Sequence, residues 1–120
     1  MRPEIWTYPS CTWMNLVDPK PEMVHIEDIA NALSNICRFT GHVKKFYSVA
    51  LHSVRVSYLV PPEDALQALL HDATEAYMSD INSPLKHTDA LAGYRLLEQR
   101  MWEVIAEKYG IPAELSYNVK

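Results

Sequence analysis

The sequence has 120 residues, which suits a single domain, and 48% of them are hydrophobic and 22% charged, as in ordinary globular proteins. The formal net charge of −4 leaves no broad basic surface of the kind that binds a nucleic-acid backbone. The sequence has no run of about 18 apolar residues that could span a membrane, and residues 1–15 do not resemble a secretion signal. We therefore expect a cytoplasmic protein without nucleic-acid or membrane partners.

Residues 1–24 form an irregular lead-in, because Pro, Asp and Asn interrupt any period. Within it, residues 5–8 and 12–16 are candidates for a short β-hairpin around Pro9 and Ser10. From Ile26 the apolar residues recur at helical spacing, through Ile29 and Leu33. This pattern predicts a helix that begins at Ile26 and ends before Gly41.

Four further helical segments follow. Residues 48–60, with Ser48 as the N-cap, are apolar on nearly every side, which predicts a buried central helix. Residues 63–78 form the clearest amphipathic helix, and residues 80–84 read as a loop. A long helix begins at Thr88 or Asp89 and ends at Tyr109, before Gly110, and a short helix is expected at 112–117. The fold class predicted from this pattern is all-α, a helical bundle over residues 25–120.

Two histidines stand out against these patterns. His52 lies in an apolar stripe with Val49, and a lone histidine there is more often a hydrogen-bonded core residue. His71, Asp72 and Glu75 share one arc of their helix at about 100° per residue, which alone could be a solvated face. Together, imidazole and carboxylate groups suit a hard-to-borderline divalent ion. We interpret His52 and the His71–Asp72 pair as ligands that meet across two helices.

A metal held in this way would lower the pKa of a water molecule toward about 7, which suits hydrolysis of a phosphate ester. Glu75 and Asp80 would supply carboxylates for proton transfer or for orienting that water. Arg38 is the best candidate for the phosphate, since a guanidinium can form two parallel bonds to it. The basic segment continues to Lys45, although its lysines are equally well explained as solvated loop charges.

The family that these residues resemble is the HD-domain metal-dependent phosphohydrolases. The resemblance rests on the runs Ser48-Val-Ala-Leu-His52-Ser-Val and Ala68-Leu-Leu-His71-Asp72-Ala-Thr-Glu75-Ala-Tyr-Met-Ser-Asp80-Ile. Within the family, the sequence is most similar to the phage- and prophage-encoded branch and to bacterial 5′-deoxynucleotidases. The similarity covers most of residues 24–118 and implies an HD-domain helical bundle.

The resemblance also implies a metal centre. His52, His71 and Asp72 would be its ligands, and the ion could be manganese, cobalt, iron, nickel, zinc or magnesium. The family has a fourth ligand, an aspartate on a later helix, but this sequence has no Asp after Asp89. We therefore expect a domain shortened at its C-terminus. Either it is a truncated form or a fragment, or its metal completes its shell with water or with a partner chain.

The remaining site residues follow from the same resemblance. Glu75 would be the catalytic acid/base or water-orienting group, and Asp80 would lie beside the sugar-phosphate and the attacking water. Arg38 and His42 would contact the substrate phosphate. The expected function is a nucleotidase that removes phosphate from deoxynucleoside 5′-monophosphates, in a monomer or a homo-oligomer. A deoxynucleoside triphosphate triphosphohydrolase is the alternative enzyme, and an inactive nucleotide- or protein-binding module is the alternative of another class.

Overall fold

The computed structural model describes residues 1–119 and begins with a β-hairpin. Strand β1 (Glu4–Thr7) pairs antiparallel with β2 (Thr12–Asn15), with Ile5 opposite Met14 and Trp6 opposite Trp13. Successive side chains of a strand point to opposite faces, so Met14 faces inward while Trp6 and Trp13 are each about half exposed. The hairpin predicted at residues 5–8 and 12–16 is confirmed, whereas the all-α fold class is wrong. The molecule is mostly helical with a two-stranded sheet, since β-branched and aromatic residues favour strands here.

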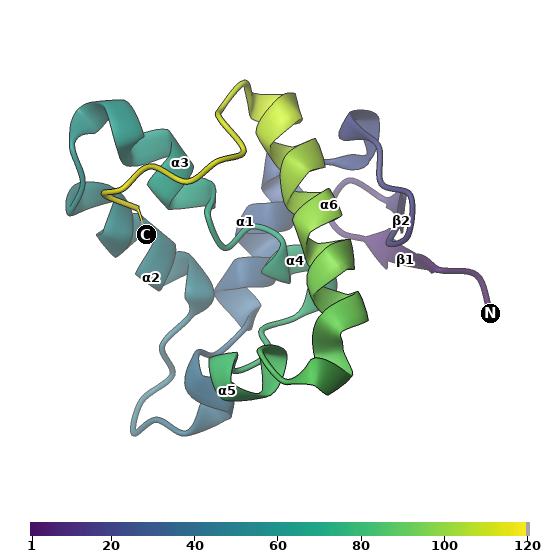
Figure 1. Ribbon diagram of the computed structural model, residues 1–120, viewed down its shortest axis with the longest axis horizontal. Helices are drawn as coiled ribbons and strands as arrows, with labels where there is room; N and C mark the ends of the chain where they lie inside the picture. The colour runs from purple at the N-terminus through teal and green to yellow at the C-terminus, as the bar shows by residue number, and fades with distance from the viewer. Residues whose placement is uncertain (120) are drawn as a thin grey trace.

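Within residues 1–119, six α-helices follow the hairpin. They are α1 (Ile26–Asn35), α2 (Val49–Tyr58), α3 (Ala65–Leu70), α4 (Glu75–Met78), α5 (Ser83–Lys86) and α6 (Ala92–Tyr109). The long helix α6 runs between the hairpin on one side and α2 and α3 on the other (Figure 1). Short 3₁₀ turns also occur, at Pro21–Met23, Phe39–Gly41, Pro62–Asp64 and Asp89–Leu91. None of the helices in the described part of the chain has both the length and the apolar character that a bilayer span requires.

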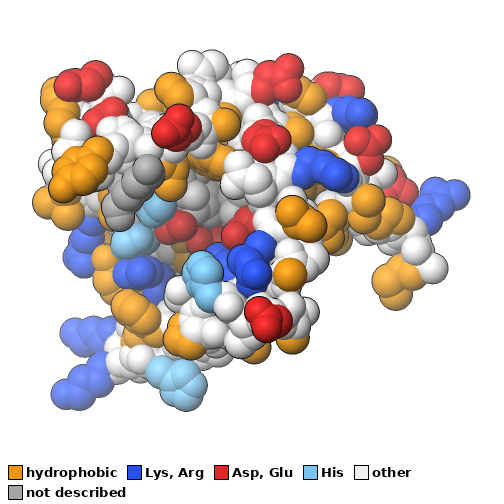
Figure 2. All heavy atoms as spheres, in the orientation of Figure 1, with side chains coloured by type: hydrophobic (Ala, Val, Ile, Leu, Met, Phe, Trp, Pro, Cys, Tyr) orange, Lys and Arg blue, Asp and Glu red, His pale blue; other side chains and the backbone are white. Residues whose placement is uncertain are grey.

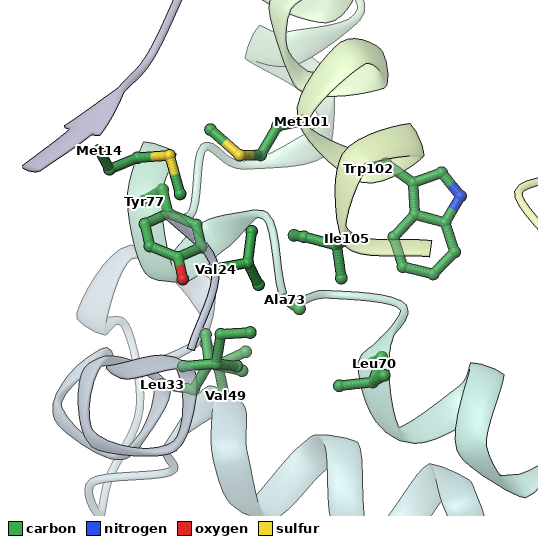
Figure 3. Close-up of a cluster of buried hydrophobic side chains, with 11 residues drawn as sticks. Met14, Val24, Leu33, Val49, Leu70, Ala73, Tyr77, Met101, Trp102 and Ile105 are labelled. Carbon is green, nitrogen blue, oxygen red and sulfur yellow. The ribbon is translucent and has the colours of Figure 1, made fainter. Parts of the chain in front are cut away.

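The core joins the lead-in to the helices (Figure 3). Met14 of β2 and Val24 are fully buried, and they pack with Met101 and Ile105 of α6 in one hydrophobic cluster. Tyr77 of α4 belongs to the same cluster. The N-terminal segment is therefore not only a lead-in, because it supplies two of the largest buried side chains.

Helix α1 ends earlier than predicted, at Asn35. Cys37 forms an antiparallel bridge with Ser48, and the flanking bonds run from Val49 N to Ile36 O and from Arg38 N to Tyr47 O, each 2.9 Å long. The pairing holds residues 36–38 extended, so the helix cannot continue to Gly41. As a result, residues 39–46 form a loop whose two ends are tied together.

The helix predicted over residues 63–78 is divided into α3 and α4. Residues 71–74 form a turn in which bonds span three residues rather than four, as from Ala73 N to Leu70 O (2.9 Å) and from Glu75 N to Asp72 O (3.0 Å). This is the tighter 3₁₀ pattern, in which side chains three residues apart lie over one another. The turn therefore stacks Glu75 over Asp72.

Three other segments differ from the sequence-based predictions. The expected loop over 80–84 contains the start of α5, which Asn82 caps by accepting a bond from Leu85 N. Residues 112–117 are not helical. Helix α2 is not buried, since only Val49 and Ser53 are inaccessible and Tyr58 is 82% exposed. An apolar pattern on all sides does not specify which face of a helix is buried. The main packing partners of α2 are α1 and α3, so the rest of its surface stays accessible.

Ile105 allows a test of this core. The residue is fully buried on α6, whereas Leu96 of the same helix is 74% exposed. We expect Ile105→Ala to lower the free energy of unfolding by about 2–5 kcal/mol, because it removes contacts and leaves a cavity. Leu96→Ala should change it by no more than about 0.5 kcal/mol. Urea denaturation monitored by circular dichroism measures both values, and equal losses would contradict the described packing.

Candidate metal centre

The ligand candidates come from two packed helices. Ser48 caps α2 by accepting a 3.0 Å bond from Leu51 N, and His52 lies in the first half of that helix. His71 ends α3, and Asp72 follows in the 71–74 turn. The Nε2 atoms of His52 and His71 lie 3.5 Å and 3.1 Å from Oδ2 of Asp72. One donor atom from each residue falls within a cluster no more than 4.8 Å across.

This donor set fits a divalent cation. Ligands that share one ion at about 2.1 Å lie about 3.0–3.5 Å from one another, which matches the two distances to Asp72. The Nδ1 atom of His71 lies 2.5 Å from the carbonyl oxygen of Ala68, so Nδ1 can donate to that carbonyl while Nε2 faces Asp72. Histidines that bind metals commonly have this arrangement, with the second nitrogen held by a backbone carbonyl or a carboxylate. Two imidazoles and one carboxylate are also the protein ligands of several catalytic metal sites, which keep further positions open.

The charges in the cluster are strongly coupled. Burial and the nearby positive charge of Arg38 lower the pKa of His52. Burial also opposes the charged form of His71, but the hydrogen bond and the charge of Asp72 outweigh it and raise the pKa of His71. The same pairing overcomes the burial of Asp72 and lowers the pKa of that carboxyl. Below the folded-state pKa of His71, the protonated imidazole and the Asp72 carboxylate therefore form an ion pair.

This ion pair predicts how metal affinity depends on pH. The pKa of His71 is raised above its ordinary value of 6.5. Protonated His71 therefore stabilises the folded protein fully below pH 6.5, and this stabilisation is lost as the pH rises through the folded-state pKa of His71. Ionised Asp72 stabilises the folded protein above pH 3.8, and this stabilisation is lost as the pH falls through the lowered pKa of Asp72.

Metal binding should depend on the same proton. A cation must displace the His71 proton, so Mn²⁺ affinity should weaken about tenfold per pH unit below the folded-state pKa of His71. Calorimetric titration between pH 6 and pH 8 measures this, and a constant affinity would contradict it.

Glu75 lies beside the ligands as a buried acid. The side chain begins α4 and is 7% exposed. Burial raises the pKa of Glu75 far above its usual value, and the charges of Asp72 and Asp80 act in the same direction. In the metal-free protein Glu75 is therefore a neutral acid that can donate a proton. A cation on Asp72 would offset one of the charges that raise this pKa, which brings the carboxyl closer to a titratable range.

Two cavities adjoin the cluster. The smaller cavity, of about 420 Å³, is lined by Arg38, Phe39 and Thr40 and by residues 80–84. The larger cavity, of about 470 Å³, is lined by Arg95, Gln99 and Trp102 of α6 and by residues 113–115. Asp72, Glu75 and Lys86 line both. Figure 2 shows acidic side chains deep in a hollow whose rim carries basic and histidine side chains.

Asp80 is held in the smaller cavity by a strained segment. Ser79, just before it, has φ 70°, which a residue with a side chain rarely adopts. The Tyr94 hydroxyl donates to the carbonyl oxygens of Met78 (3.1 Å) and Ser79 (3.3 Å). Such strain costs on the order of 1–3 kcal/mol and persists where the surroundings fix it. The tyrosine bonds thus help to fix the backbone from which Asp80 projects.

The structure brings most of the predicted site residues together. His52, His71 and Asp72 form the donor cluster, Glu75 adjoins it, and the predicted residues that line the smaller cavity are Arg38, Asp72, Glu75 and Asp80. His42 is exposed and lines neither cavity, so it is not part of this arrangement.

Other residues at the site were missed by the sequence reasoning. Tyr94 was not singled out from the sequence, and Asn82 was placed in the loop expected over residues 80–84. Neither carries a motif, because the role of each depends on contacts with residues distant in the sequence. Only the cap signal of Asn, three residues before Leu85, could have indicated α5.

Comparisons with known proteins place the chain among bacterial sequences. It is 56% identical over 95 residues to the uncharacterized protein YfdR of Escherichia coli K12, a match that covers 79% of this chain and 52% of YfdR. It is 34% identical over 116 residues to the uncharacterized protein RCAP_rcc00048 of Rhodobacter capsulatus, covering 89% of this chain and 59% of that protein. No protein-family model matches the sequence. The chain thus spans little more than half the length of the curated relatives that it matches.

Proposed function

We propose that this chain is a metal-dependent phosphohydrolase that removes phosphate from deoxynucleoside 5′-monophosphates. The observation that carries the proposal is the cluster of His52, His71 and Asp72, whose donor atoms lie within 4.8 Å of one another beside a buried acid. A cavity with a guanidinium on its wall adjoins the cluster. The resemblance of these residues to the HD-domain phosphohydrolases supports the same activity.

Each residue then has a defined task. His52, His71 and Asp72 would hold the cation, and a divalent ion bound there supplies Lewis acidity that lowers the pKa of a water molecule and offsets phosphate charge. Arg38 binds the phosphate through two parallel N–H donors. Glu75 moves a proton between the attacking water and the leaving oxygen. Asp80, which also lines the smaller cavity, orients the water.

The charges favour a monophosphate over a triphosphate. Lys86 lines both cavities, but its Nζ is 3.2 Å from Oε1 of Glu98 and is therefore neutralised. Arg38 takes part in no ion pair within residues 1–119. Arg95 lines the larger cavity, where it donates to the carbonyl oxygens of Lys86 and Thr88. In the smaller cavity the described guanidinium is that of Arg38, which suits one phosphate group better than the larger charge of a triphosphate. This comparison ranks the triphosphohydrolase second.

Phosphate release from purified protein tests the proposal. The chain would be loaded with Mn²⁺ or Co²⁺ and incubated with deoxynucleoside mono- and triphosphates, with a chelated sample as the control. We expect metal-dependent release from monophosphates. Triphosphate cleavage alone would favour the second candidate. A folded, metal-loaded protein that releases nothing would overturn the enzymatic proposal and leave a binding module.

A further inference from the structure

The Arg38 guanidinium is held by aromatic rings rather than by carboxylates. Its central carbon lies 4.5 Å from the ring centroid of Phe39 and 5.6 Å from that of Tyr47. Its side chain donates no hydrogen bond within residues 1–119, although its backbone bonds to Tyr47 and Gly41. Cations over aromatic faces are attracted to the ring without using their N–H donors. The N–H donors of Arg38 thus remain available to an anion in the smaller cavity.

Tyr47 is better placed than Phe39 to fix this guanidinium. Phe39 is 55% exposed and lies on the loop, whereas Tyr47 is half-buried where the two chain segments pair. The carbonyl oxygen of Tyr47 accepts a 2.9 Å bond from Arg38 N, so backbone and ring both constrain the arginine. A second guanidinium, that of Arg55 on α2, lies 5.2 Å from the same ring. The ring is therefore restrained from α2 as well as from its own segment.

We propose that Tyr47 is a positioning residue, whose ring holds the Arg38 guanidinium at the wall of the cavity so that it can receive a phosphate group. The inference rests on the proposed function for the identity of the anion. It assigns a role in recognition to a residue that lines neither cavity and is not one of the metal-ligand candidates. Because the ring acts through Arg38, its loss should matter only while Arg38 is present.

A double-mutant cycle on phosphate binding tests this coupling. The dissociation constant of inorganic phosphate would be measured by calorimetry on the Mn²⁺-loaded chain, and KM and kcat on a deoxynucleoside monophosphate. Arg38→Ala should weaken phosphate binding roughly 10- to 100-fold, as for lost charged hydrogen bonds. Tyr47→Leu should weaken it about three- to tenfold and raise KM more than it lowers kcat. Tyr47→Phe keeps the ring and should restore binding, and Tyr47→Leu should add nothing to Arg38→Ala.

A matched control and distinct outcomes keep the two proposals separate. Tyr58→Leu makes the same change at a tyrosine that is 82% exposed and lines neither cavity, and it should leave phosphate binding unchanged. Normal binding in folded Tyr47→Leu, or equal losses with and without Arg38, would overturn the positioning role. Phosphate binding that follows the expected cycle, in a protein that hydrolyses no nucleotide, would overturn the enzymatic proposal and support the positioning role. A wild-type protein that neither binds inorganic phosphate nor hydrolyses a monophosphate would overturn both.

Discussion

Replacing Asp72 with asparagine should release the divalent cation while leaving the helical fold intact. The oxygen Oδ2 of Asp72 is the atom that both histidines approach, at 3.5 and 3.1 Å, so its charge is the centre of the donor set. An amide has nearly the same shape but no charge to offer the ion. We expect Mn²⁺ affinity to fall about 100-fold or more, since even the loss of a hydrogen bond behind a ligand costs about 10- to 100-fold.

Calorimetric titration with Mn²⁺ measures this loss, and circular dichroism checks the fold. Asp89→Asn is the matched control, because Asp89 is exposed and lines neither cavity. The variant also reports on Glu75, whose pKa is raised in part by the charge of Asp72. That pKa should therefore fall in Asp72→Asn, which carboxyl NMR can follow. Unchanged metal affinity in a folded Asp72→Asn protein would remove Asp72 from the centre.

Glu75→Gln should keep the metal and lose the reaction. The side chain is 7% exposed and neutral in the metal-free protein, so a neutral amide of similar size fits its site with little effect on stability. The amide cannot transfer a proton in the way that a carboxyl group does. Loss of a general acid or base typically lowers turnover by about 100- to 10,000-fold, and we expect kcat to fall in that range.

Measuring kcat together with Mn²⁺ affinity separates this role from ligation. Glu107→Gln, at an exposed position on α6, is the control and should behave as the wild type. Turnover near the wild-type value would show that Glu75 carries no proton in the mechanism. A parallel loss of metal would instead make Glu75 a ligand, contrary to the donor set described above.

Local patterns predicted which residues lie together in the candidate site better than they predicted the path of the backbone. The period of apolar residues placed α1, α2 and α6, and His52, singled out because it lies in an apolar stripe, is close to His71 and Asp72 in the structure. Residue type alone was enough to choose His52 as a candidate, because imidazole and carboxylate groups are rare among apolar neighbours. The hairpin was also predictable from its β-branched and aromatic residues.

Features that depend on distant contacts were not predictable. A continuous helical period gave no sign of the turn at residues 71–74, since the 3₁₀ and α patterns differ by only one residue in their bonds. The early end of α1 depends on the bridge between Cys37 and Ser48, which no local pattern encodes. Tyr47 and Tyr94 act through contacts made by tertiary folding. His42 was named from resemblance alone, and the structure leaves it outside the cavities.

The turn between α3 and α4 gives up regular helix geometry and places Glu75 beside Asp72. A straight helix through residues 71–74 would gain regular hydrogen bonds, but it would rotate Glu75 away from its position over Asp72. Substitutions that strengthen helix propensity in this turn would therefore favour a continuous α-helix, which would move Glu75 away from Asp72. A substitution of Thr74 by a stronger helix former is therefore expected to disturb the candidate site even if it raises the free energy of unfolding, a trade-off that is common where sites retain irregular backbone.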